Sequence, residues 1–82
     1  MDKIYSLVIR GSQRKKVVRA LDKPKIPTQI KEETKLSLNN VSDVLRLLEK
    51  IEVVKCSNPK EKTGRIYKLT EKGMKIREEL LK

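Results

Sequence analysis

An apolar stripe at helical spacing runs through residues 38–51 and constrains the fold more than any other feature of the sequence. Aliphatic side chains recur there every three or four residues, and polar side chains fall on the opposite face at about 100° per residue. The apolar set is Leu38, Val41, Val44, Leu45, Leu48 and Ile51, and the polar set is Asn39, Asp43, Arg46 and Lys50. With two Tyr and no Phe or Trp in 82 residues, the core that receives this stripe must consist of Leu, Ile and Val. Such a core favours long amphipathic helices over an aromatic-rich sandwich.

Shorter helices are predicted before this stripe. Ser12 is a candidate N-cap for the helix in "QRKKVVRALD". Pro27 suits the first turn of a short helix that finishes near Thr34, because its missing N–H costs nothing there. Ser37 then caps the longer helix. A short and a longer helix separated by about three residues have the spacing of a helix-turn-helix.

The hydrophobic pattern changes after the stripe. "VVKCS" and "RIYKL" are short and rich in β-branched or aromatic residues, and the turn sequence "NPKEKTG" separates them, which predicts a β-hairpin. Thr70 is the predicted N-cap of a last helix, whose Ile76 and Leu80 share one face with Gly73. Residues 1–10 fit a helix or an added strand, and their spacing favours the helix.

A single domain over residues 1–82 is therefore expected, because the chain is too short for a second core. Its predicted class is mainly α with a small β-hairpin (α+β). The predicted order is helix, short helix, turn, longer helix, hairpin and helix, with an extra helix or strand at the N-terminus. This succession is that of a winged helix.

The net charge of +10, from 21 Lys and Arg against 11 Asp and Glu, makes nucleic acid the first partner to consider. A heavily charged surface of the thermophilic kind is the alternative, but that bias raises both signs together. Residues 1–22 carry six cations and two Asp, net +4, and residues 53–70 carry five cations and one Glu, also net +4. Residues 38–52 carry two cations and three acids, net −1. The positive charge therefore lies outside the predicted longer helix.

Several function classes have no support in the composition. The chain has no His and one Cys, so neither a transition-metal site nor a Cys/His nucleophile is expected. The three Gly are too far apart for a phosphate-binding loop, and the acids are dispersed, so no enzyme activity and no cofactor are predicted. Cys56 cannot form an internal disulfide, which fits a reducing cytoplasm, and is expected to be a small buried hydrophobe. No apolar run is long enough to span a membrane.

Together, "KIPTQI", "LSLNNVSDVLRLLEKIEVVKC" and "GRIYKLTEKG" resemble the winged-helix transcription regulators of the MarR/ArsR type, in particular short archaeal members. The resemblance covers roughly residues 12–75. It implies a winged helix-turn-helix that binds double-stranded DNA, with the longer helix in the major groove and a basic wing on the backbone or the minor groove. The alternative is a winged-helix protein-interaction module within a larger transcription or replication assembly, with only nonspecific DNA affinity.

The resemblance also implies roles for individual residues. Asn suits recognition of adenine and Arg that of guanine, so the base-reading set is Ser37, Asn39, Asn40, Ser42, Asp43 and Arg46. The set that contacts the DNA backbone is Thr28, Gln29, Lys15, Lys16 and Arg19, and the set in the wing is Lys60, Lys62 and Arg65. Tyr67 is expected to pack the wing against the core. A homodimer through the N-terminal segment and the last helix is expected, because apolar residues there exceed the needs of a small core.

Two residues depart from the family pattern. Asp43 stands where a basic or neutral polar residue is common; it would repel a phosphate but could accept a hydrogen bond from a cytosine amino group. Glu52 stands where a Gly usually forms a left-handed cap after the longer helix. A Glu in that conformation costs about 1 kcal/mol.

Overall fold

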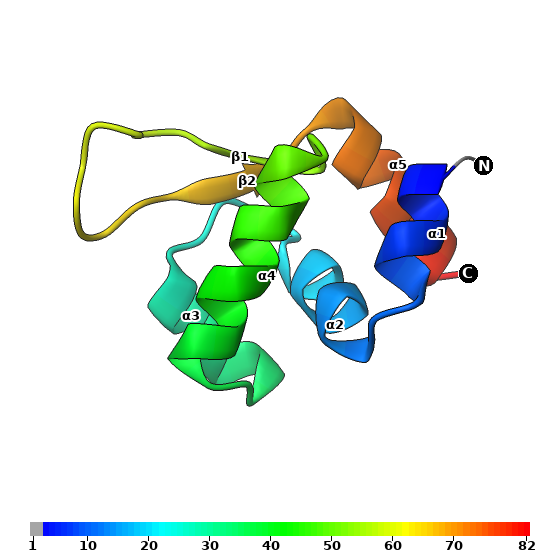
Figure 1. Cartoon of the computed structure of the whole chain (residues 1–82), viewed down its shortest axis with the longest axis horizontal. Helices are drawn as coiled ribbons and strands as arrows, with labels where there is room; N and C mark the ends of the chain where they lie inside the picture. The colour runs from blue at the N-terminus through cyan, green and yellow to red at the C-terminus, as the bar shows by residue number, and fades with distance from the viewer. Residues whose placement is uncertain (1–2) are drawn as a thin grey trace.

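Five helices and one two-stranded hairpin form within residues 3–82, the part of the chain that the computed structural model describes. In chain order they are α1 (Lys3–Ile9), α2 (Ser12–Ala20), α3 (Pro27–Thr34), α4 (Leu38–Lys50), β1 (Val54–Cys56), β2 (Tyr67–Leu69) and α5 (Glu71–Leu80) (Figure 1). The mainly helical α+β class is confirmed, and the N-terminal segment forms the helix α1 rather than an added strand. Residues 1 and 2 of the predicted domain lie outside the described residues. None of the described helices is long and apolar enough to cross a membrane.

α4 is amphipathic as its sequence predicts, except at its first turn. Val41, Val44, Leu45 and Leu48 are buried. Ser37 is the N-cap, and its Oγ accepts a hydrogen bond from the Asn40 N–H at 3.1 Å, so the predicted cap is confirmed. Leu38 is 46% exposed, and its assignment to the buried stripe is wrong. Leu38 lies one turn before Val41, which is the first side chain of α4 to be buried in the core.

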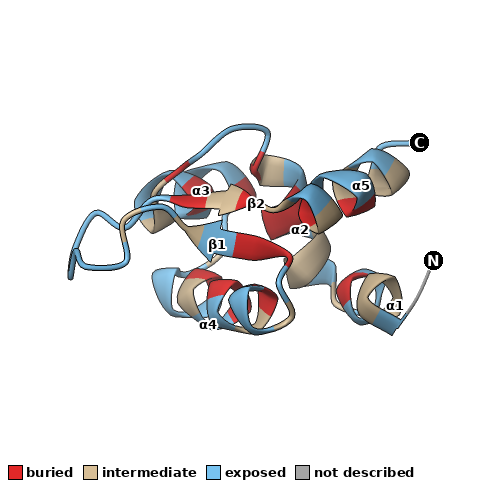
Figure 2. Ribbon diagram, turned by 90° about the horizontal axis from the view of Figure 1, so that it is seen from above, coloured by how far each residue is buried: buried red, intermediate tan, exposed pale blue. Residues whose placement is uncertain are grey.

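The core is aliphatic except for Tyr67 and lies between the helices and one face of the hairpin (Figure 2). β1 and β2 are antiparallel, with Val54 opposite Leu69 and Cys56 opposite Tyr67. Tyr67 is buried, which confirms its packing role, whereas Cys56 is half-buried at the edge of the core rather than within it. Each buried Val, Leu or Ile side chain contributes about 1.5–3 kcal/mol. The core side chains are Val8, Val17, Val18, Leu21, Ile30, Val41, Val44, Leu45, Leu48, Val53, Val54, Tyr67, Leu69 and Ile76.

The junction of α1 and α2 differs from the prediction. Gly11 is the N-cap of α2, and Ser12 is already helical, so the assignment of Ser12 as the cap is wrong. The reason is that α1 and α2 follow each other directly. The Gly11 N–H donates to the Val8 carbonyl at 3.3 Å, and its own carbonyl accepts the first hydrogen bond of α2 from the Lys15 N–H at 3.0 Å. Arg14 Nη1 also donates to the Leu7 carbonyl at 2.6 Å, which ties the two helices together.

Lys25 connects the segment between α2 and α3 to the hairpin. Its N–H donates to the Tyr67 carbonyl at 2.9 Å, and its carbonyl accepts from the Tyr67 N–H at 2.8 Å, so this segment pairs with the edge of β2. The side chain is only 4% exposed, and Nζ donates to the Ala20 carbonyl and to Glu33 Oε1, both at 2.6 Å. Asp22 Oδ1 lies 2.9 Å from the same ammonium.

The carboxylates of Asp22 and Glu33 keep the Lys25 ammonium charged. Burial disfavours the charge of Lys25, but the hydrogen bonds to Glu33 and Asp22 outweigh burial and raise its pKa. The hydrogen bond from Lys25 in turn lowers the pKa of Asp22. The charged Lys25 ammonium therefore binds three acceptors. They are the Ala20 carbonyl at the end of α2, the Asp22 carboxylate just after it and the Glu33 carboxylate on α3.

The lowered pKa of Asp22 predicts a stability contribution that depends on pH. The unfolded chain holds the Asp22 proton up to the ordinary pKa of 3.8, whereas the folded chain releases it at lower pH. The contribution is therefore complete above about pH 5 and is lost as the pH falls through the lowered folded-state pKa. Asp22→Asn should lower the melting temperature at pH 7 and have little effect at pH 2, as measured by circular dichroism across this range. Asp43→Asn, which removes an exposed carboxylate on α4, is the matched control. If the melting temperature of Asp22→Asn followed that of the wild type at every pH, the prediction would be contradicted.

The start of α5 lies close against the segment that joins α4 to β1. Thr70 is its N-cap, as predicted: Oγ1 accepts from the Gly73 N–H at 3.1 Å and donates to the Glu52 carbonyl at 2.6 Å. Glu52 has a φ of 65°, so the left-handed conformation expected at this position is observed. Gly73 is buried, and a Cβ there would collide with the carbonyl oxygen of Val53. The distance between α5 and this backbone therefore requires Gly at position 73.

Gly73→Ala should destabilise the protein by about 3 kcal/mol, because the added methyl group forces α5 away from the Val53 carbonyl. The better helix propensity of Ala, about 1 kcal/mol, offsets only part of this cost. Urea unfolding at pH 7 measures the difference. Lys75→Ala changes an exposed position on the same helix and should stay within about 0.5 kcal/mol of the wild type. If the two variants unfolded at the same urea concentration, the close contact between position 73 and the Val53 carbonyl would be contradicted.

Candidate nucleic-acid interface

The outward face of α4 is polar and carries little net charge. Asn39, Asn40, Asp43 and Arg46 are exposed, and Ser42 is half-buried at the edge of this face. Arg46 Nη1 lies 3.7 Å from Asp43 Oδ1, with both side chains largely exposed. An exposed pair of this kind is worth about 0–1 kcal/mol, so a ligand can displace it at little cost. Arg46 therefore offsets the charge of Asp43 on this face of α4.

The start of α3 supplies fewer free polar groups than the sequence indicates. Thr28 is exposed in the first turn. Gln29 is also exposed, but its Oε1 accepts a hydrogen bond from the Ile26 N–H at 3.0 Å, so this side chain caps its own helix. Ser37 likewise uses its Oγ as the acceptor that caps α4, which leaves the hydroxyl hydrogen as a donor.

The cations predicted on α2 do not surround the polar face of α4. Lys16 and Arg19 line a shallow depression of about 330 Å³ between α2 and α3, together with Ala20, Glu33 and Thr34. Lys15 is half-buried. The depression beside Asp43 is a different one, and α2 contributes Arg14 to it. Arg14 was not among the predicted residues, because its position next to Asp43 depends on how α1, α2 and α4 pack together.

The loop that joins β1 to β2, residues 57–66, is the hairpin loop, and it projects from the body beside the end of α4 (Figure 1). Lys60 and Lys62 are exposed there and form no ion pair with any described residue. Arg65 is also exposed, but its Nε donates to the Glu61 carbonyl at 2.8 Å. A hydrogen bond with the Tyr67 side chain raises the pKa of Arg65. The hairpin loop therefore offers two unpaired cations and one that is bonded internally.

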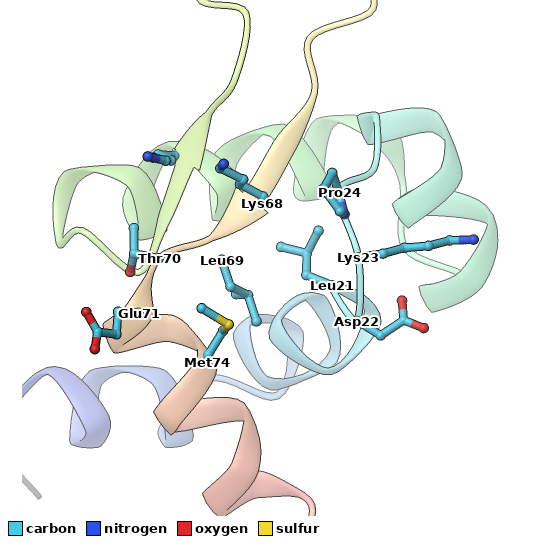
Figure 3. A pocket seen from close by; sticks show the side chains of 10 residues that line it. Leu21, Asp22, Lys23, Pro24, Lys68, Leu69, Thr70, Glu71 and Met74 are labelled. Atoms are coloured by element: carbon cyan, nitrogen blue, oxygen red, sulfur yellow. The ribbon is translucent and has the colours of Figure 1, made fainter.

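Two further lysines lie at the base of the hairpin. Lys55 and Lys68 are directly opposite each other in the strand register, on the face away from the core. They border a depression of about 360 Å³ that is also lined by Leu21, Leu69 and Met74 and by the carboxylates of Asp22 and Glu71 (Figure 3). Like charges placed opposite each other across two strands are unfavourable, and a nearby anion would relieve the repulsion. These lysines extend the positive surface from the hairpin loop to the body of the protein.

Comparisons of the chain with models of protein families, with curated proteins and with solved structures gave no match. Among the residues that the structure describes, no group of three or more His, Cys, Asp and Glu side chains is arranged to hold a metal ion. The candidate site therefore consists of the polar face of α4 and the cations of the hairpin.

Proposed function

We propose that the chain is a winged helix-turn-helix protein that binds double-stranded DNA in a sequence-specific manner and regulates transcription, as the MarR/ArsR resemblance implies. The observation that carries the proposal is a protruding cationic loop that leaves the body near the end of α4, a helix whose outward face is polar and exposed (Figure 1). The pairing of Lys25 with Tyr67 supports it, because it fixes the hairpin against the segment that leads into α3.

In this proposal the two parts of the surface act on different parts of DNA. α4 lies in the major groove, where Asn39 and Arg46 hydrogen-bond to base edges. Lys60 and Lys62 contact phosphates, which attract the protein to any duplex and set its position. Arg46 exchanges its exposed contact with Asp43 for a guanine, and the freed Asp43 accepts from a cytosine amino group. Affinity thus comes mainly from the hairpin loop and specificity from α4.

A second copy of the chain is the proposed protein partner. α1 and the end of α5 lie at the end of the molecule opposite the hairpin loop (Figure 1). Leu7 and Ile9 of α1 are each 37% exposed there, and Leu81 after α5 is 56% exposed. Pairing of these surfaces about a two-fold axis leaves both copies of α4 and of the hairpin loop free for DNA.

Selection of bound sites from random duplex DNA at moderate salt tests the function. The proposal predicts a recovered palindrome, because two symmetry-related copies of α4 read two half-sites about one helical turn apart. A single half-site without symmetry would retain sequence-specific binding and exclude the dimer. A flat, salt-sensitive profile would overturn the proposal and favour a protein-interaction module whose DNA affinity is only electrostatic.

Substitutions separate the two parts of the surface. Asn39→Ala should reduce the affinity ratio between the selected site and unrelated duplex by about 5- to 100-fold, because it removes a bidentate contact with a base. Lys60→Gln with Lys62→Gln should weaken binding to all duplexes and reduce the salt slope, d log K/d log[salt], by about two. Fluorescence anisotropy at several salt concentrations measures both, with Lys75→Gln on α5 as the control for loss of a single cation outside the hairpin loop. An unchanged slope for the double variant would exclude the contact between the hairpin loop and phosphates.

A further inference from the structure

The hairpin loop is closed at its neck by Asn58. The strand pairing continues one step beyond β1 and β2, because the Ser57 N–H donates to the Ile66 carbonyl at 2.7 Å. Asn58 Oδ1 then accepts from the Ile66 N–H at 2.7 Å, and Nδ2 of the same amide donates to the Gly64 carbonyl at 3.2 Å. Cys56 Sγ lies 3.5 Å from the same Oδ1. One side chain therefore uses both its acceptor and its donor to hold the two sides of the loop together.

Arg65 performs a similar function further along the loop. Its Nε donates to the Glu61 carbonyl at 2.8 Å, and Nη2 donates to the Pro59 carbonyl at 3.4 Å. The Glu61 N–H donates in turn to the Asn58 carbonyl at 3.0 Å, which closes a turn with Pro59 at its second position. The planar guanidinium is suited to this task, because it presents several donors in a fixed arrangement.

These bonds leave the lysines of the loop free. The carbonyls of Asn58, Pro59, Glu61 and Gly64 all accept hydrogen bonds from within the loop. Lys60 and Lys62 are exposed and take no part in them. A loop of this length without internal bonds would be ordered only on binding, and the loss of side-chain freedom would then weaken the affinity.

We infer that Asn58 and Arg65 are positioning residues that hold the hairpin loop in its binding shape, and that Lys60 and Lys62, not Arg65, are its phosphate contacts. The inference rests on the proposed DNA binding and changes the role of one predicted residue. Arg65 was expected to contact DNA because it is cationic and lies in the loop. Its charge still adds to the positive field, but two of its donors are directed to carbonyls of the loop itself.

The substitution Arg65→Lys separates the two roles, because Lys keeps the charge but cannot bond both carbonyls in the same way. We expect Arg65→Lys and Asn58→Ala each to weaken binding to the selected duplex about 3- to 10-fold with an unchanged salt slope, since no phosphate contact is lost. Thr63→Ala, an exposed position in the same loop, is the matched control and should bind like the wild type. The readout is fluorescence anisotropy at several salt concentrations.

Wild-type affinity for both Arg65→Lys and Asn58→Ala would overturn the inference. A salt slope that falls by about one in Arg65→Gln would also overturn it, because that result assigns Arg65 to a phosphate. Amide hydrogen exchange without DNA supplies an independent test. Asn58→Ala should speed exchange of the Ile66 amide at least 10-fold and leave the amides of α4 unchanged, as expected for a local opening. Unchanged exchange at Ile66 would overturn the inference even if the wild type binds DNA. Failure of the wild type to bind any duplex would overturn the proposed function and the phosphate contacts of Lys60 and Lys62, and exchange at Ile66 would then test the positioning role of Asn58 alone.

Discussion

The buried ammonium of Lys25 is the interaction on which the arrangement of the other parts depends. Two strands of three residues each are too short to be stable alone in water. Lys25 pairs its backbone with Tyr67 and directs its side chain to Ala20, Asp22 and Glu33, so it joins the hairpin to the end of α2 and to α3. Because α4 also packs on β1, the helices and the hairpin are held in one fixed geometry. The angle between α4 and the hairpin loop follows from these contacts.

Charge is divided between the surfaces in a way that suits the proposed function. The segment that contains α4 has a net charge of −1, and its exposed Arg46 is already close to Asp43. The hairpin carries four cations that form no ion pair with a described residue, from Lys60 and Lys62 at the loop to Lys55 and Lys68 at its base. Phosphates attract such cations at a distance of about 10 Å at ordinary salt. Base edges are polar but uncharged and are recognised at contact distance, which in the proposed function is the role of the Asn39 amide.

The parts of the fold that could be predicted from sequence are those determined by neighbouring residues. The caps Ser37 and Thr70 act within one helical turn, and the amphipathic spacing of α4 needs only the helical period. Glu52 follows α4 at the position where a left-handed residue commonly ends a helix, which is why that conformation was expected there. None of these features requires knowledge of distant contacts.

The features that sequence did not predict depend on tertiary packing. The partners of the Lys25 ammonium come from α2, α3 and the segment between them, and the exposure of Leu38 depends on where a small core ends. In the candidate site, residue type alone indicates that Arg65 is cationic. Its engagement with Glu61 and Pro59 follows from the path of the loop, which no local pattern specifies.

The internal bonds of the hairpin loop have a consequence for survival of the protein in the cell. Exposed loop tips are preferred sites of proteolytic cleavage, and this loop contains Lys60, Lys62 and Arg65, the residue types after which trypsin-like proteases cut. A protease must first draw the loop into an extended form, which requires the bonds of Asn58 and Arg65 to open. When that opening is rapid and reversible, the cleavage rate follows the small population of open loops. The chain can thus expose a basic loop to solvent without making it an easy substrate.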